Sequence, residues 1–288
     1  MSKASIIRFL RSRLPPKAYE IARMSWWHLK HYFPGLVAAW FITPKPEVYG
    51  FGREPGVADL VRQLQGINVL APTRMWHVMS KYGSDKGNCW HNYTTVYAVL
   101  FQGFRDRPLR LFELGLGTNN TEFSHNMGTY GRPGASLRGW RQLFPSALIY
   151  GADIDRGVLF QEDRIKTFYC DQLSQSSIQE LWSQHDLQGG LDVIIEDGLH
   201  TFEANTSFLS GSLEHVRPGG WYVTEDIAGT TIDRWKQQLE TVYSVRYPSY
   251  AFALVRLPNS ANDFDNNLLI VRRSVNQCQA ESMGGEEV

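Results

Sequence analysis

The sequence predicts an α/β fold built on a mostly parallel sheet. From about residue 109 onward, short apolar runs alternate with amphipathic stretches at regular intervals. Such alternation indicates strand–helix–strand units, whose strands run parallel and are covered by helices on both faces. Near the C-terminus, two apolar runs follow one another with only a polar loop between them, so one of these strands must run antiparallel. We therefore predict a Rossmann-like sheet of seven strands, preceded by an N-terminal helical segment.

The apolar runs and the amphipathic stretches locate the individual elements. The five parallel strands are expected at 110–114, 148–154, 165–169, 192–196 and 220–224, and the final pair at 250–257 and 267–273. The helices among them are expected at 136–143, 157–162, 174–184, 201–215 and 231–241. Upstream, helices are expected at 58–65, at 72–81 and after Thr94 to about residue 102.

Length and composition divide the chain into three parts. With 288 residues and 43% hydrophobic content, it can bury one sizeable core. We expect residues 1–75 to be a basic helical segment and a linker, with the proline- and glycine-rich stretch 44–57 as that linker. Residues 76–275 form the main domain, and residues 276–288 form a disordered acidic tail. Residues 1–45 carry eight lysines and arginines and one acid, Glu20, which suits a helical cap or a peripheral contact with an anionic membrane.

Charge and cysteine content restrict the partners and the compartment. Lysine plus arginine equal aspartate plus glutamate, 29 to 29, so no global charge favours nucleic acid. The three cysteines show no metal-binding spacing, which suits the reducing cytoplasm. No apolar run reaches the roughly 18 residues of a membrane span. The sequence leaves a homo-oligomer open.

Glycines and one carboxylate follow the first parallel strand. In open α/β sheets, ligands bind beyond the carboxyl ends of the strands. Here Glu113, Gly115 and Gly117 stand at that place, and the glycines allow a tight turn and a close approach of a ligand to the backbone. The third glycine of a dinucleotide fingerprint is absent, and a long loop, 118–133, precedes the next helix. This pattern argues against a pyrophosphate seated on a helix N-terminus.

Polar residues after the second and third strands suit a nucleoside. A carboxylate after the second strand, from Asp153 or else from Asp155, can accept hydrogen bonds from both ribose hydroxyls. After the third strand, Asp171 and Gln172 can bond the amine and the ring edge of adenine. These four residues, with Glu113 and the two glycines, form the predicted cofactor site.

Carboxylates follow the fourth and fifth strands and predict a metal site. Asp197 follows one strand, and Glu225 and Asp226 follow the other. Adjacent strand ends lie about 5 Å apart, so the three carboxylates converge and repel one another unless a cation neutralises them. Oxygen ligands favour Mg²⁺ or Mn²⁺. His200 can then accept a proton from a hydroxyl whose pKa the metal lowers.

Several motifs together resemble one known family. Over residues 80–275 the chain is similar to the metal-dependent sugar O-methyltransferases of macrolide biosynthesis and to the cephalosporin methoxylation proteins. The segments that carry the resemblance are Glu113-Leu114-Gly115-Leu116-Gly117, Gly134-Ala135-Ser136-Leu137-Arg138-Gly139-Trp140, Tyr150-Gly151-Ala152-Asp153-Ile154-Asp155, Glu196-Asp197-Gly198-Leu199-His200, Arg217-Pro218-Gly219-Gly220 and Glu225-Asp226.

The resemblance implies a class I methyltransferase fold that uses S-adenosyl-L-methionine and Mg²⁺. It implies that Asp197, Glu225 and Asp226 hold the metal and that His200 is the catalytic base. A further segment recurs in relatives, and we interpret it as a lid whose Lys86 and Tyr93 lie near the cofactor's carboxylate. Glu196 departs from the family pattern, because an aspartate often stands there.

The acceptor is expected to be a small molecule or a glycan, with a hydroxyl on a sugar, a glycoconjugate or a natural product as the methylated group. The sequence leaves two alternative functions open. A nucleotide-sugar-modifying oxidoreductase would need the dinucleotide fingerprint that Gly115 and Gly117 do not complete. A non-catalytic, membrane-associated binding protein on the same fold would not need a complete set of metal ligands and a base.

Overall fold

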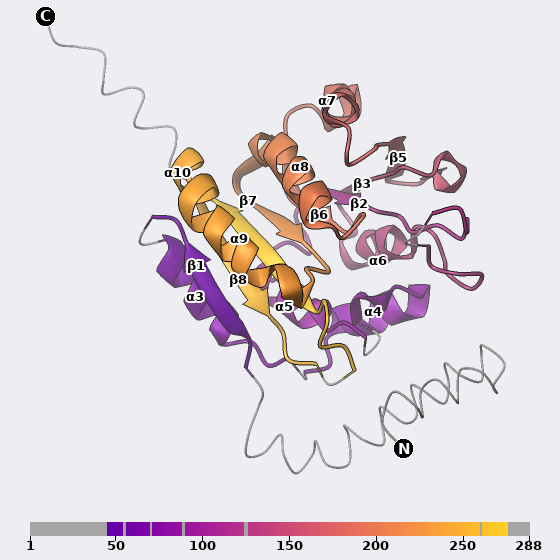
Figure 1. Cartoon of the computed structure of the whole chain (residues 1–288). Helices are drawn as coiled ribbons and strands as arrows, with labels where there is room; N and C mark the ends of the chain where they lie inside the picture. The colour runs from indigo at the N-terminus through magenta and orange to yellow at the C-terminus, as the bar shows by residue number, and fades with distance from the viewer. Residues whose placement is uncertain are drawn as a thin grey trace, which may run out of the picture. The chain divides into compact units, whose positions relative to one another are not determined.

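A sheet of nine strands organises the part of the chain that the structure describes (Figure 1). The structure is a computed structural model, and it describes residues 45–275 except 54–55, 70, 88–89, 124–125 and 260. The strand order is β1-β8-β9-β7-β6-β2-β3-β5-β4. The basic segment predicted for residues 1–44 and the predicted acidic tail, 276–288, lie outside the described residues.

Five strands form the parallel centre of the sheet, as the sequence predicts. In spatial order they are β5 (Ile165–Tyr169), β3 (Leu148–Asp153), β2 (Arg110–Leu114), β6 (Leu191–Glu196) and β7 (Val216–Thr224). The chain starts at β2, adds β3 and β5 on one side, and then returns to add β6 and β7 on the other. The strand order therefore reverses at β2, and this switch point is where a ligand crevice is expected.

The predicted C-terminal hairpin completes a seven-stranded unit. It consists of β8 (Tyr250–Arg256) and β9 (Asn267–Arg273). β9 lies between β7 and β8 and runs antiparallel to both. Two additional antiparallel strands extend the edges, β1 (Glu47–Phe51) on β8 and β4 (Gln161–Glu162) on β5.

Helices cover both faces of the sheet because side chains alternate along each strand. Leu111 belongs to one core and its neighbour Phe112 to the other. The first core is closed by α3 (Gly56–Gln65), α4 (Arg74–Tyr82), α5 (Tyr93–Leu100) and α6 (Ala135–Leu143). The second is closed by α7 (Gln175–Ser183), α8 (Phe202–Ser212) and α9 (Ile232–Gln238), which continues through a π-turn, Leu239–Tyr243, into α10 (Ser244–Arg246).

Local capping residues set the ends of several helices. The side chain of Thr73 accepts a hydrogen bond from the Trp76 amide at the start of α4, and Ser174 and Thr201 do the same for α7 and α8. These side chains satisfy amides that the helix leaves unpaired. Gly83 ends α4 in a left-handed conformation that suits glycine.

The structure corrects two predicted elements. The stretch predicted as a linker, 44–57, contains a strand, because Glu47–Phe51 pair with β8, and the unit that contains the sheet begins at Lys45. Gly50 has a packing role there, since an added Cβ would lie 2.6 Å from side-chain atoms of Val57 and Val61 in α3. The helix predicted at 157–162 is instead a single 3₁₀ turn, Arg156–Val158, followed by β4.

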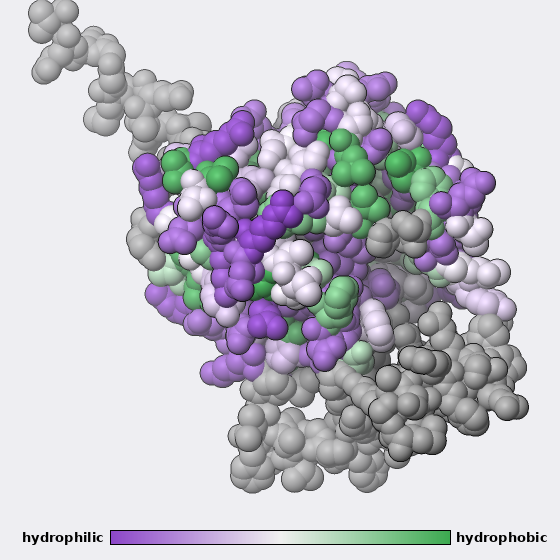
Figure 2. All heavy atoms as spheres, in the orientation of Figure 1, coloured by the Kyte–Doolittle hydropathy of each residue, from purple (hydrophilic) through white to green (hydrophobic). Residues whose placement is uncertain are grey.

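No helix of the described residues is long and apolar enough to cross a membrane. On the face shown in Figure 2, the apolar side chains of the described residues are interspersed among hydrophilic ones.

Phe112 provides a test of the packing between the sheet and the second helical layer. Its ring is fully buried, 5.0 Å from that of Trp182 and 6.2 Å from that of Phe208. We expect Phe112→Ala to lower the free energy of unfolding by about 3–5 kcal/mol, because it leaves a cavity in the core. Urea denaturation measures this change. Leu148→Ala, at a side chain that is 46% exposed, is the control, and an equal loss in both variants would contradict the packing described here.

Candidate cofactor cavity and metal centre

A cavity of about 350 Å³ lies at the carboxyl ends of the parallel strands, where the switch in strand order predicts it. Its wall includes residues from β2 and β3 and from the loops that follow β2, β3, β5 and β6. Of the residues predicted to bind a cofactor, those in the wall are Lys86, Gly115, Gly117, Asp153, Asp171 and Gln172.

Gly115 and Gly117 are required by contacts as well as by backbone conformation. Both have positive φ angles, +91° and +74°. A Cβ on Gly115 would lie 1.9 Å from the carbonyl oxygen of Asp197, and one on Gly117 would lie 2.0 Å from Sδ of Met127. Hence Gly115 allows the turn after β2 to pack against the backbone of Asp197. Gly117 allows Met127, from the 118–133 loop, to pack against the same turn.

Asp153 is the better placed of the two predicted ribose ligands. Its two carboxylate oxygens accept hydrogen bonds from the amides of Leu116 and Asp155, each at 2.8 Å. Burial raises its pKa, and these amide contacts oppose the rise. Each oxygen keeps a lone pair for a hydroxyl in the cavity. Asp155 is outside the wall; it caps the turn after β3 through the Gly157 amide and bonds the hydroxyl of Thr118.

The side chain of Gln172 is already bonded within the protein. Its Nε2 donates to Oε1 of Glu196 at 2.6 Å, and its Oε1 accepts from the amide of Leu199 at 2.9 Å. These contacts use one of the two Nε2 hydrogens and one of the two Oε1 lone pairs, so the role of Gln172 at the edge of adenine stays a prediction. The Asp171 carboxylate makes fewer contacts within the protein, since its Oδ1 accepts one hydrogen bond, from the Leu173 amide at 3.0 Å.

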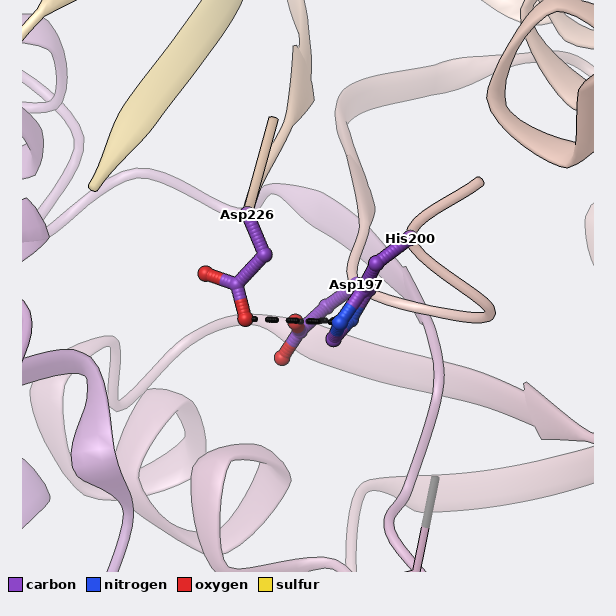
Figure 3. A group of neighbouring side chains, drawn as sticks. All are labelled: Asp197, His200 and Asp226. Carbon is purple, nitrogen blue, oxygen red and sulfur yellow. Dashed lines mark ion pairs between the residues drawn. The ribbon is translucent and has the colours of Figure 1, made fainter. Parts of the chain in front are cut away.

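Asp197, His200 and Asp226 converge beside the cavity (Figure 3). One possible ligand atom from each lies within 4.8 Å of the others. The ring of His200 lies between the two acids, with Nε2 3.2 Å from Oδ1 of Asp197 and Nδ1 3.5 Å from Oδ2 of Asp226. The two carboxylates are oxygen donors that suit Mg²⁺ or Mn²⁺, with the imidazole beside them.

Backbone strain accompanies this cluster. His200 and Asp226 have φ angles of 60° and 54°, values that side chains other than glycine rarely adopt. Such strain persists when the surrounding structure holds the residue in place, and it is concentrated at functional sites.

Glu225 is not among the residues whose ligand atoms converge in this cluster, although the sequence predicts it as a ligand. Its Oε2 lies 2.5 Å from Nζ of Lys86, and its Oε1 accepts a hydrogen bond from the hydroxyl of Tyr97. The structure thus brings the three predicted carboxylates together, but both oxygens of Glu225 already have donors. The metal role of Glu225 stays a prediction that these contacts do not favour.

The ammonium of Lys86 is paired with acids of the site, contacts that the sequence did not predict. Its ammonium lies 2.6 Å from Asp197, 2.5 Å from Glu225 and 3.5 Å from Glu113. Burial alone would lower its pKa, but the three carboxylates raise it well above the ordinary value. Lys86 lines the cavity and its ammonium is paired with these acids, so its role at the cofactor's carboxylate stays a prediction that these contacts do not favour.

Glu113 and Tyr93 are also predicted cofactor ligands that the structure places outside the cavity wall. Glu113 is fully buried and accepts hydrogen bonds from Ser136 Oγ and Trp140 Nε1. The hydroxyl of Tyr93 donates to Oδ1 of Asp226 at 2.7 Å. Both side chains are therefore bonded within the protein, and their roles as cofactor ligands stay predictions that these contacts do not favour.

His91 and Tyr97 belong to the site and were not predicted. His91 is buried, with Nδ1 3.4 Å from Oδ1 of Asp226 and Nε2 3.9 Å from Oδ2 of Asp85. Tyr97 bonds Glu225 and His91 contacts Asp226, and in each pair the two residues are more than 100 positions apart in the sequence. No local sequence pattern could therefore have identified these contacts.

The order of the central seven strands and the position of the cavity define a class I methyltransferase fold. The same fold is found in the solved MycE methyltransferase from the mycinamycin biosynthetic pathway, in complex with Mg and SAH. The match has a TM-score of 0.52 at 24% sequence identity and covers 81% of this chain and 63% of that one.

Sequence comparison finds curated sugar O-methyltransferases. The chain is 30% identical, over 247 residues, to 8-demethyl-8-alpha-L-rhamnosyl tetracenomycin-C 2'-O-methyltransferase of Streptomyces olivaceus, covering 81% of this chain and 58% of the relative. It is 34% identical, over 148 residues, to demethylmacrocin O-methyltransferase of Streptomyces fradiae, covering 51% of this chain and 35% of the relative. The chain therefore spans between about a third and three fifths of the length of these relatives. No protein-family model matches it.

The chain thus has a class I methyltransferase fold, and its sequence resembles those of methyltransferases that act on sugars of natural products.

The charge state of His200 is open to direct measurement in metal-free protein. Burial opposes its charged form, but Asp197 and Asp226 outweigh burial and raise the pKa to about 10. Because the folded-state pKa lies above the ordinary value of about 6.5, the charged ring stabilises the fold fully below pH 6.5, and this stabilisation is lost as the pH rises through about 10.

We expect the imidazole ¹⁵N signals of His200 to titrate well above pH 6.5 in metal-free protein, and the midpoint to fall when Mg²⁺ is added. His215, whose pKa burial lowers, is an internal control. A midpoint at or below that of His215 would refute the ion pairs described for His200.

Proposed function

We propose that this chain is an S-adenosyl-L-methionine-dependent, Mg²⁺-dependent O-methyltransferase that acts on a sugar hydroxyl of a natural product or glycoconjugate. The observation that carries the proposal is the cluster of Asp197, His200 and Asp226 beside a cavity with nucleoside-binding features. The relatives named above are O-methyltransferases of sugars on natural products, which supports the reaction and the acceptor class.

The cavity suits the cofactor through its own residues. Asp153 offers oxygens to ribose hydroxyls, and Gly115 and Gly117 let a ligand approach the backbone closely. S-adenosyl-L-methionine supplies the electrophilic methyl group. A dinucleotide fits less well, because a loop, and not a helix N-terminus, follows Gly117 until α6 begins at Ala135. This observation disfavours the oxidoreductase alternative.

The acidic cluster suits the metal and the proton transfer. Asp197 and Asp226 would hold the metal, which lowers the pKa of a bound acceptor hydroxyl. A divalent cation held by these two acids would offset the charge that favours the imidazolium of His200. The neutral ring of His200, which lies within 3.5 Å of both carboxylates, would then be placed to accept a proton from the acceptor hydroxyl.

The central test of the proposal is methyl transfer by the purified chain to rhamnosylated and macrolide acceptors, followed by mass spectrometry. We expect EDTA to abolish turnover and Mg²⁺ to restore it. We expect Asp197→Ala and His200→Ala to reduce turnover by about 100-fold or more, the usual scale for a lost acid–base group. Asp233→Ala, at a side chain that is 97% exposed on α9, should leave turnover unchanged. Turnover that is insensitive to EDTA and to Asp197→Ala would refute the metal role.

Arg132 is the residue that we propose for the cofactor's carboxylate. Among the described residues that line the cavity, the candidates for binding an anion are Lys86, Arg132 and His200. Lys86 and His200 are paired with acids. No ion pair to Arg132 occurs within the described part of the chain, and its side chain packs beside Gly83, next to the cavity residues Ser84 and Asp85.

A comparison of two ligands tests this placement. A charge-assisted hydrogen bond contributes about 1.5–3 kcal/mol, so Arg132→Gln should weaken the binding of S-adenosylhomocysteine by roughly 10–100-fold. The binding of 5′-methylthioadenosine, which lacks the amino-acid end, should not change. Calorimetry measures both affinities, with Arg156→Gln as the control at an exposed arginine outside the cavity wall. Equal weakening for both ligands would contradict the assignment.

A further inference from the structure

Gln172 connects two parts of the site that arise from strands that are not neighbours. It follows β5, while the metal-site loop, residues 197–200, follows β6, and β2 and β3 lie between these strands. Its side chain is nevertheless bonded to Glu196, just before that loop, through Nε2 and to the amide of Leu199 within the loop through Oε1. The same side chain forms part of the cavity wall.

Glu196 extends this connection. It is fully buried at the end of β6, and its Oε1 accepts hydrogen bonds both from Gln172 and from the amide of Gly198, at 2.6 and 3.2 Å. The amides of Gly198 and Leu199, in the middle of the loop, are therefore both fixed by the Gln172–Glu196 pair.

The loop fits closely against Gln172. A Cβ on Gly198 would lie only 2.2 Å from Oε1 of Gln172, so a residue larger than glycine would displace the contact. The loop also contains His200 in its left-handed conformation, which costs on the order of 1–3 kcal/mol and needs support from its surroundings. Gln172 provides support of this kind on the side of the cavity.

We propose that Gln172 is a positioning residue that holds the loop 197–200, and with it Asp197 and His200, against the cavity wall, and so couples the cofactor cavity to the metal centre. The inference rests on the proposed function. It differs from a direct role in reading adenine, because the Gln172 amide acts here through its contacts with Glu196 and Leu199 and not through a contact with the ligand.

Coupling follows from the position of Gln172. A ligand in the cavity that packs on this side chain restricts it, and the restricted side chain holds the loop in the conformation that presents Asp197 and His200. Since coupling between two binding sites is reciprocal, a metal ion on the loop must favour the ligand in the cavity by the same factor.

The test compares Gln172→Leu with Gln175→Leu in the full chain. Gln175 is a matched control, because it lies three residues further on, is exposed, and bonds Ser207 outside the cavity. Mn²⁺ affinity is measured by electron paramagnetic resonance and S-adenosylhomocysteine affinity by calorimetry, with and without Mn²⁺. We expect Gln172→Leu to weaken Mn²⁺ binding by about 10-fold or more, as residues that orient metal ligands usually do. In metal-free protein, it should leave S-adenosylhomocysteine affinity within about 3-fold.

A second readout does not depend on the metal. Hydrogen–deuterium exchange of the metal-free protein reports the amides of Gly198 and Leu199. We expect the segment 196–200 to exchange faster in Gln172→Leu, and also in the shorter Gln172→Asn, but not in Gln175→Leu. Far-ultraviolet circular dichroism confirms that each variant is folded, and the Asn variant provides the comparison if the Leu variant does not fold.

Each outcome decides a different point. A large loss of S-adenosylhomocysteine affinity with unchanged Mn²⁺ affinity and unchanged exchange would show that Gln172 contacts the ligand and would overturn the proposal. Unchanged values in every assay would overturn it too. If Mn²⁺ does not improve S-adenosylhomocysteine binding to the unmodified protein, the coupling is refuted. If the unmodified protein binds no Mn²⁺, the proposed function fails in its metal part, while the exchange data still decide whether Gln172 holds the loop.

Discussion

The ammonium group of Lys86 lies among three carboxylates that come from three different strands. Glu113 belongs to β2, Asp197 follows β6 and Glu225 follows β7. Buried acids this close would otherwise take up protons, because burial and mutual repulsion both disfavour their charge. Lys86 itself belongs to the 3₁₀ turn Asp85–Gly87 that follows α4. One charge therefore connects the first helical layer to the carboxyl edge of the sheet, and it leaves one oxygen of Asp197 directed toward His200.

The helices next to this charge contribute neutral donors. Tyr93 and Tyr97 of α5 donate to Asp226 and Glu225, and Ser136 and Trp140 of α6 donate to Glu113. Carboxylates that accept hydrogen bonds stay in fixed orientations, which a metal site requires. α5 and α6 thus serve the core with their apolar side chains and the site with their polar ones.

The sequence predicted the sheet well because strand patterns are local. The strands Arg110–Leu114, Ile165–Tyr169 and Asn267–Arg273 have the predicted bounds. The helix predicted at 157–162 failed because Asp155 caps a short turn and Thr167 bonds the backbone of Phe160, so that β4 folds back on β5. β1 was missed because the prolines and glycines of the stretch 44–57 suggested a linker, although Gly50 is what allows α3 to approach.

For the site, topology predicted the location but not the partners. Parallel strand ends must meet, so Asp197 and Asp226 could be placed together from their order alone. Lys86 lies 111 residues from Asp197 and 139 from Glu225, and such pairs follow from the packing of helices on the sheet, which no local pattern encodes. The same holds for Gln172, whose place after β5 was predicted and whose bonds across the crevice were not.

The left-handed backbone at positions 200 and 226 has a consequence for how this site can vary. Asparagine, aspartate and histidine enter that conformation more readily than other side chains, and β-branched residues are strongly disfavoured there. The backbone alone thus already restricts these two positions to a small set of amino acids, several of which can bind metals or protons. In a descendant that no longer needed the chemistry, asparagine or glycine would be the substitutions that the fold accepts most easily at these two positions. The backbone conformation there could therefore be retained after the activity is lost.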